Sequence, residues 1–106
     1  YITGTRHYPR LVPLALAGAR GAQVPVHLGH DRPFYLSGLT ADWTSASDHG
    51  SFHDVGVPFL YFGVEDHADV HAPTDTADRI EPRFLAASAE VVLSTLLAAD
   101  SASATD

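Results

Sequence analysis

A nearly unbroken apolar run, Val57-Pro58-Phe59-Leu60-Tyr61-Phe62, restricts the possible folds of this chain more than any other feature. A strand with apolar side chains on both faces is buried on both sides, which is typical of parallel sheets. Shorter β-prone stretches lie at 1–4 and 24–28, and helical periodicity lies at 10–19 and 81–98. Because strands and helices alternate, the sequence predicts an α/β fold, a partial three-layer sandwich with a mostly parallel sheet.

Capping and turn residues set the predicted ends of the remaining segments. Ser47 is expected to cap a short helix that ends at Val55, with Gly56 as its stop. Residues 29–46 have no periodicity and are expected to form a long loop. Residues 99–106 are small and polar, so we expect a disordered tail there. Three short strands cannot form a self-sufficient sheet with both faces covered, so we expect residues 1–98 to belong to a larger domain.

The charge balance and the absence of Cys narrow the possible ligands. The chain has 6 Arg, no Lys and 13 Asp plus Glu, for a net charge of −7. This charge argues against nucleic acid and anionic membranes as partners, because both favour clustered positive charge. No apolar run approaches the roughly 20 residues needed to span a bilayer, so no membrane insertion is expected. Without Cys, any bound metal has to be held by imidazole and carboxylate groups.

Two pairs of histidines have the spacing at which two rings share one face of a helix. His49 and His53 fall on a predicted helix, but no Glu stands between them as the base of a metalloprotease helix would. A solvated helix face is therefore the favoured interpretation of this pair. His67 and His71 precede Pro73, which argues against a helix there. That segment is either a charged surface loop or a ligand-bearing loop beyond the carboxyl end of a strand.

Three motifs occur in a fixed order along the chain: Ser47-Asp48-His49-Gly50-Ser51-Phe52, Gly56-Val57-Pro58 and His71-Ala72-Pro73-Thr74-Asp75-Thr76. Together they resemble the closing signature of metallopeptidase family twenty-eight, which contains zinc aminopeptidases and, more distantly, glutaminyl cyclases. The resemblance implies that residues 1–98 are the C-terminal portion of a zinc-exopeptidase-like domain. It also implies two zinc ions in the complete domain, a peptide substrate with a free N-terminus, and an extracytoplasmic location.

The resemblance assigns roles to few residues of this chain. His71 matches the last zinc ligand of the family. Asp48 matches an acidic position that orients neighbouring groups near the metals, although it also suits the first turn of a helix, where the dipole favours a carboxylate. Asp75 is expected to brace the loop of His71 or to cap the following segment, with no direct role in the chemistry. Val70 stands where several relatives have a Tyr that can stabilise the tetrahedral intermediate.

No catalytic residue is expected within this chain. The family's general base is one of two adjacent Glu, whereas the three Glu here, at positions 65, 81 and 90, are all separate. We therefore expect part of a zinc aminopeptidase whose isolated chain is inactive and binds zinc weakly, with the remainder of the peptidase domain as its partner. Two alternatives stay open: an acyl transferase of the glutaminyl cyclase kind, and a non-catalytic homologue that serves as a binding or structural domain.

Overall fold

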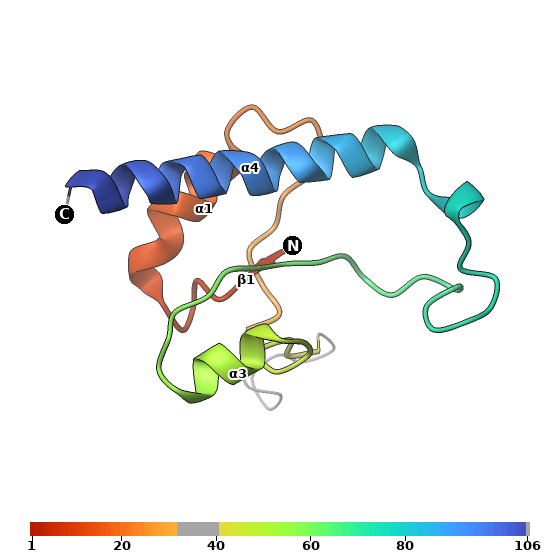
Figure 1. The fold of residues 1–106 in the computed structure, drawn as a ribbon, viewed down its shortest axis with the longest axis horizontal. Coiled ribbons are helices and arrows are strands. Elements are labelled where there is room, and N and C mark those ends of the chain that lie inside the picture. The colour runs from red at the N-terminus through yellow and green to blue at the C-terminus, as the bar shows by residue number, and fades with distance from the viewer. Residues whose placement is uncertain (32–40, 106) are drawn as a thin grey trace.

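The computed structural model describes residues 1–31 and 41–105, in which short strands and helices are joined by long irregular segments (Figure 1). Part of the loop predicted at 29–46 therefore lies outside the described residues. The elements in chain order are β1 (Ile2–Thr3), the 3₁₀ helix η1 (Pro9–Leu11), α1 (Val12–Ala19), α3 (His49–Asp54), β2 (Tyr61–Phe62), the 3₁₀ helix η2 (Ala77–Arg79) and α4 (Pro82–Thr105).

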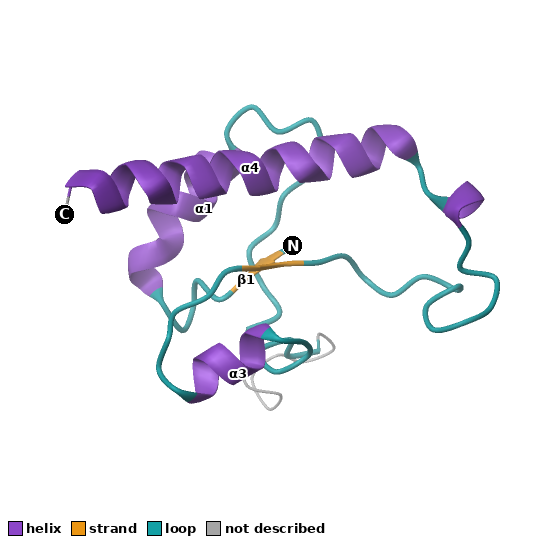
Figure 2. Ribbon diagram, in the orientation of Figure 1, coloured by secondary structure: helices purple, strands orange, loops and turns teal. Residues whose placement is uncertain are grey.

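The predicted three-layer sandwich with a mostly parallel sheet is wrong. Helix and loop dominate the described residues, and their sheet has two antiparallel strands, with Ile2 opposite Phe62 and Thr3 opposite Tyr61 (Figure 2). The stretch 24–28 contributes a single parallel bridge, from Leu28 to Ile2. In the apolar run 57–62, Pro58 has no N–H to donate to a ladder, and only Phe59 is buried. The run therefore forms a strand over its last two residues alone.

The core lies where α1 crosses α4. Ala15 and Val91 are buried there at 0% and 5% exposure, together with Ile2 of β1. Gly18 lies against Thr95 of α4, so closely that a Cβ at position 18 would overlap the Thr95 hydroxyl. The absence of a side chain at Gly18 therefore sets how near the two helices approach.

Helices α1 and α4 each have a proline in the first turn, where its missing N–H leaves no helix bond unmade. Pro13 lies in the first turn of α1, and Pro82 is the first residue of α4. The Glu81 carboxylate accepts hydrogen bonds from the N–H groups of Arg83 at 3.3 Å and Phe84 at 2.7 Å, two donors that have no partner within the helix. Its negative charge also suits the positive end of the helix dipole.

Two predicted boundaries differ from the structure. The short helix α3 has Asp48, and not Ser47, at its N-cap, and no side chain caps it. It ends before Gly56, whose φ of 79° is the left-handed conformation expected of a glycine stop. At the C-terminus, residues 99–105 are helical instead of forming a disordered tail. The Ala, Ser and Thr residues there include no Gly or Pro to stop α4, so the helix continues.

Helix α4 buries only one side, and its remaining surface is unusually apolar. Leu96, Leu97 and Leu85 are 63%, 58% and 57% exposed. By length and composition alone α4 could cross a membrane, because Pro82–Ser103 has a mean hydropathy of 1.4. The same properties suit a helix whose several faces pack against other protein, and one face of α4 already packs on α1.

Candidate functional site

His71 lies on an exposed turn in the long segment between β2 and α4. The turn is closed by backbone hydrogen bonds from Val70 to His67 at 3.1 Å and from Ala72 to Asp69 at 3.0 Å. The φ of His71 is 58°, a left-handed conformation that costs energy for a residue with a Cβ. The N–H of Asp75 donates to the carbonyl of Ala72 at 3.1 Å, which closes a further turn after His71. The bracing or capping role expected of Asp75 stays a prediction.

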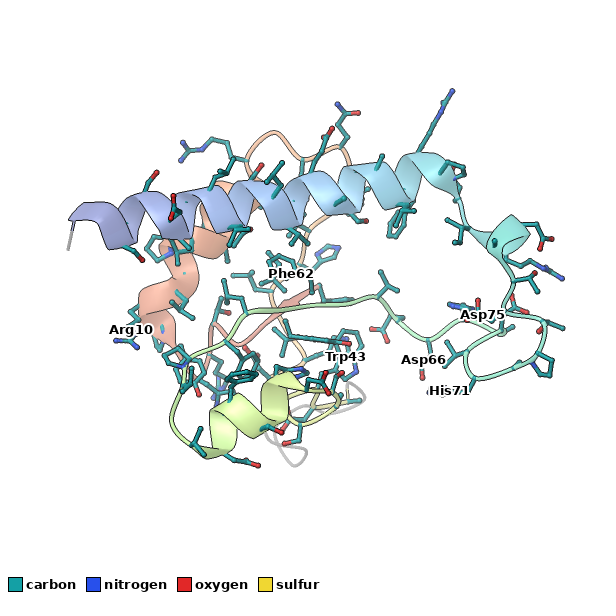
Figure 3. All side chains as sticks on the ribbon, in the orientation of Figure 1. Arg10, Trp43, Phe62, Asp66, His71 and Asp75 are labelled. Atoms are coloured by element: carbon teal, nitrogen blue, oxygen red, sulfur yellow. The ribbon has the colours of Figure 1, made fainter. Side chains whose placement is uncertain are left out.

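The structure does not bring Asp48 and His71 together. The loop that carries Asp66, His71 and Asp75 lies at the end of the molecule opposite Arg10 and away from α3 (Figure 3). Asp48, at the N-cap of α3, is exposed, and its side chain makes no capping hydrogen bond. The expectation that Asp48 orients groups next to His71 stays a prediction.

The two histidines of α3 are structural residues, so the interpretation of this pair as a solvated helix face is wrong. His49 stacks on Tyr61 with ring centroids 4.1 Å apart, and its Nε2–H donates to the carbonyl of Trp43 at 2.6 Å. Its Nδ1 is buried with no hydrogen-bond partner among the described residues. Nδ1 of His53 lies 2.6 Å from the hydroxyl of Tyr8. Through these contacts both rings hold α3 against β2 and against the loops that carry Trp43 and Tyr8.

A buried polar cluster around His30 was not found by sequence reasoning. His30 is 5% exposed and stacks on Trp43 with ring centroids 3.6 Å apart and planes 6° from parallel. Its Nδ1 lies 2.6 Å from the carbonyl oxygen of Ala41, and its Nε2 lies 2.7 Å from Oε1 of Glu65. The residue lies in a stretch rich in Gly, Pro and Asp, where no periodicity marks a buried position.

The neighbouring Asp31 is also buried, at 3% exposure, and fixes the chain after β1. Its Oδ2 accepts hydrogen bonds from the N–H groups of Gly4 at 3.1 Å and Arg6 at 2.9 Å. The carboxylate therefore satisfies two backbone donors in the turn that leads to α1.

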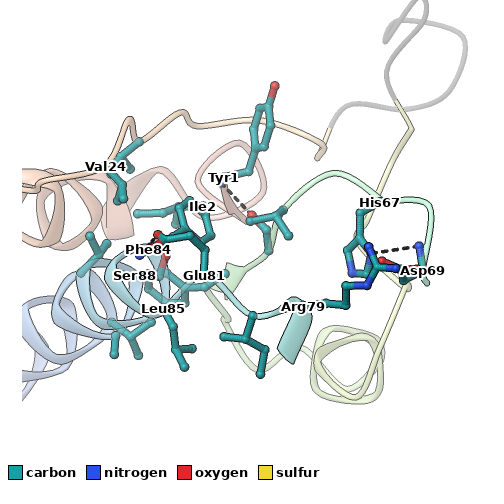
Figure 4. A pocket seen from close by; sticks show the side chains of 18 of the residues that line it. Tyr1, Ile2, Val24, His67, Asp69, Arg79, Glu81, Phe84, Leu85 and Ser88 are labelled. Atoms are coloured by element: carbon teal, nitrogen blue, oxygen red, sulfur yellow. Dashed lines mark hydrogen bonds between the residues drawn. The ribbon is translucent and has the colours of Figure 1, made fainter. Parts of the chain in front are cut away.

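A cleft of about 680 Å³ opens between α4 and the sheet, beside the segment that carries His71 (Figure 4). Its walls are mostly apolar and include Ile2, Val24, Phe62 and Leu85, whereas His67, Asp69 and Arg79 gather at one end. The volume falls within the range of small-molecule pockets. Because the exposed apolar stripe of α4 forms one wall, the cleft equally suits a further layer of protein.

Comparison with known proteins decides the family. Residues 22–96 match the model of Peptidase family M28, and this stretch contains all three motifs of the predicted signature. The chain belongs to peptidase family M28. Neither a curated protein nor a solved structure matches the chain.

The described residues of this M28 chain do not by themselves form a zinc site. They contain no group of three or more His, Asp or Glu side chains close enough together to hold a metal ion. A single imidazole is a poor zinc site, since zinc in proteins takes three or four protein ligands. Any zinc bound through His71 therefore requires donors from outside the described residues.

Two of the Glu side chains have structural partners, which bears on the expected location of the catalytic base. The Glu65 carboxylate binds His30, and the Glu81 carboxylate caps α4. Glu90 is exposed on α4, remote in sequence from the turn of His71. None of the three is placed beside His71 by a hydrogen bond. That the general base lies outside this chain stays a prediction.

Proposed function

We propose that this chain is part of a zinc-dependent aminopeptidase, and that His71 supplies one ligand to a zinc ion. The observation that carries the proposal is the M28 match over residues 22–96, which includes the turn of His71. M28 proteins are peptidases, so hydrolysis of peptide bonds is the activity the family supports. The substrate in this proposal is a peptide with a free N-terminus.

The local structure around His71 supports the ligand role. Its ring makes no hydrogen bond among the described residues, so its unprotonated nitrogen is available to a metal and its N–H to an outside acceptor. The left-handed backbone at a non-glycine residue is a strained conformation of the kind that clusters at functional sites. The remaining zinc ligands and the general base come, in this proposal, from another part of the peptidase.

The exposed apolar surface of α4 supports a protein partner of this kind. Leu85, Leu93 and Leu96 are each more than half exposed, and such a contiguous apolar face marks an interaction surface. We propose that the rest of the peptidase domain covers this face. Arg83, Glu90 and Asp100 are distributed along α4 and favour packing within a protein over insertion in a bilayer. We also propose an extracytoplasmic location.

Hydrolysis assays on the complete protein test the proposal. We expect cleavage of leucine anilide, loss of that activity on dialysis against a chelator, and recovery on addition of zinc. An N-acetylated leucine anilide is the matched control, and it should not be cleaved. Cyclisation of peptides with N-terminal Gln, without hydrolysis of leucine anilide, would instead assign the glutaminyl cyclase reaction. Absence of both activities in zinc-loaded protein would favour the non-catalytic alternative.

A further inference from the structure

Among the residues that the structure describes, one hydrogen bond joins the segment that carries His71, residues 64–80, to the rest of the molecule. Between β2 and α4, the hydrogen bonds of residues 64–80 among the described residues connect neighbours within the segment, with a single exception. The exception is the contact between Glu65 and Nε2 of His30 at 2.7 Å. Gly63, the residue before the segment, is bonded to Tyr1 through both its N–H and its carbonyl, so the pair of His30 and Glu65 holds the first residues beyond that strand pairing.

The partners of His30 determine how many protons its ring carries. The carbonyl oxygen of Ala41 can only accept, so Nδ1 has to carry a proton. An ionised Glu65 can also only accept, so Nε2 has to carry a proton as well. The Glu65 side chain is 61% exposed, which keeps its charged form hydrated, whereas the His30 side chain is 2% exposed. A ring that makes both bonds to these groups is an imidazolium.

The surroundings of His30 favour a positive charge despite the burial. The indole of Trp43 lies parallel to the ring at 3.6 Å, and an aromatic face attracts a cation. The ring of Tyr1 is nearly perpendicular to that of His30, with centroids 4.4 Å apart, and the ring centroid of His27 lies 5.5 Å from that of Tyr1. Among the described residues, the charged groups near the ring are the Glu65 carboxylate, the buried Asp31 carboxylate and the amino group of Tyr1.

The geometry points to His30 as a positioning residue: we propose that, as an imidazolium, it holds Glu65 and thereby fixes the segment 64–80 that presents His71. Loss of one proton removes one of the two donors, so one of the two bonds breaks. The Glu65 carboxylate is 61% exposed and can bind water in place of the ring, so its bond is the one that breaks. Deprotonation therefore releases Glu65, and with it the segment 64–80, from His30. The consequence for catalysis rests on the proposed function, whereas the contact itself and its dependence on pH do not.

Hydrogen exchange of the complete protein tests the positioning role of His30 without measuring activity. At pH 5.5, a value above the ordinary Glu titration, we expect amides of residues 64–80 to be protected about 10-fold more than at pH 9, after correction for intrinsic exchange. Glu65→Gln and His30→Gln should each remove this difference. His27→Gln, an exposed substitution of the same kind in the stretch 24–28 beside β1, should preserve it. Because Glu65 is exposed, its variant keeps the test valid even if His30→Gln does not fold.

A spectroscopic measurement separates a charged His30 from a merely buried one. In ¹⁵N NMR spectra at pH 5.5, both ring nitrogens of His30 should show a directly bonded proton, and at pH 9 only one. A single protonated nitrogen at pH 5.5, or exchange protection that does not change with pH in the wild-type protein, overturns the inference. Failure of the zinc and hydrolysis assays with these signals intact would overturn the proposed function alone.

Discussion

Replacement of Gly18 by Ala tests the packing of α1 on α4, on which the core depends. In an exposed helix this substitution stabilises by about 1 kcal/mol, because Ala has the higher helix propensity. Here the new methyl group would overlap Oγ1 of Thr95 and would lie 3.0 Å from the carbonyl oxygen of Val91. The Thr95 hydroxyl donates to that same carbonyl at 2.8 Å, so moving it aside breaks a buried hydrogen bond.

The balance of these effects favours destabilisation. Overpacking of a core costs about 1–3 kcal/mol and the broken hydrogen bond about 1 kcal/mol more, against a propensity gain of about 1 kcal/mol. We therefore expect Gly18→Ala to lower the free energy of unfolding by about 1–3 kcal/mol. In a Thr95→Ala background the overlap with the hydroxyl disappears. There Gly18→Ala should lower the free energy of unfolding by at least about 1 kcal/mol less than it does in the wild-type background.

Urea unfolding of the wild type, the two single variants and the double variant measures this coupling. A stabilisation of about 1 kcal/mol by Gly18→Ala, equal in both backgrounds, would mean that the helices do not meet at this glycine. That result would refute the α1–α4 contact and the account of the core built on it.

Two further substitutions test local features of the fold. Glu81→Ala removes the acceptor for the first N–H groups of α4 and should lower the free energy of unfolding by about 1 kcal/mol, measured by thermal or urea unfolding. The control is Glu90→Ala, on the exposed face of the same helix, which should change this free energy by less than about 0.5 kcal/mol. Equal effects of the two would contradict the cap. Asp31→Ala leaves the N–H groups of Gly4 and Arg6 without their acceptor and should lower the free energy of unfolding by about 2 kcal/mol or more. An unchanged urea midpoint would show that these two bonds do not contribute to stability.

The helices were more predictable than the sheet because their signals are local. The periodicity at 10–19 and 81–98 and the stop at Gly56 lie within the helices or next to them, and the structure has a helix at each of these places. Strand pairing depends on residues far apart in sequence, and the apolar run 57–62 alone does not reveal its partners. Its apolar character predicted a strand buried on both faces, but in the described residues it pairs on one edge with β1 only. Helix α4 likewise carries apolar side chains that stay exposed here and that a larger domain would bury.

The candidate site was predictable where it rests on motifs and unpredictable where it rests on contacts. The ordered motifs that end at Thr76 identified the family, and the match over residues 22–96 confirms it. The contact between His30 and Glu65 joins positions 35 residues apart, and nothing in the local sequence signals it. The burial of His49 and His53 depends likewise on Tyr61 and Tyr8, which lie elsewhere in the chain.

The zinc content of the purified complete protein, compared between His71→Ala and His67→Ala, tests the central claim most directly. Both histidines are exposed in the same segment, so loss of a surface imidazole is matched between the two variants. We expect His71→Ala to lower bound zinc and leucine anilide hydrolysis together, and His67→Ala to leave both near wild type. Equal zinc content and equal hydrolysis in His71→Ala and wild-type protein would remove His71 from the metal site.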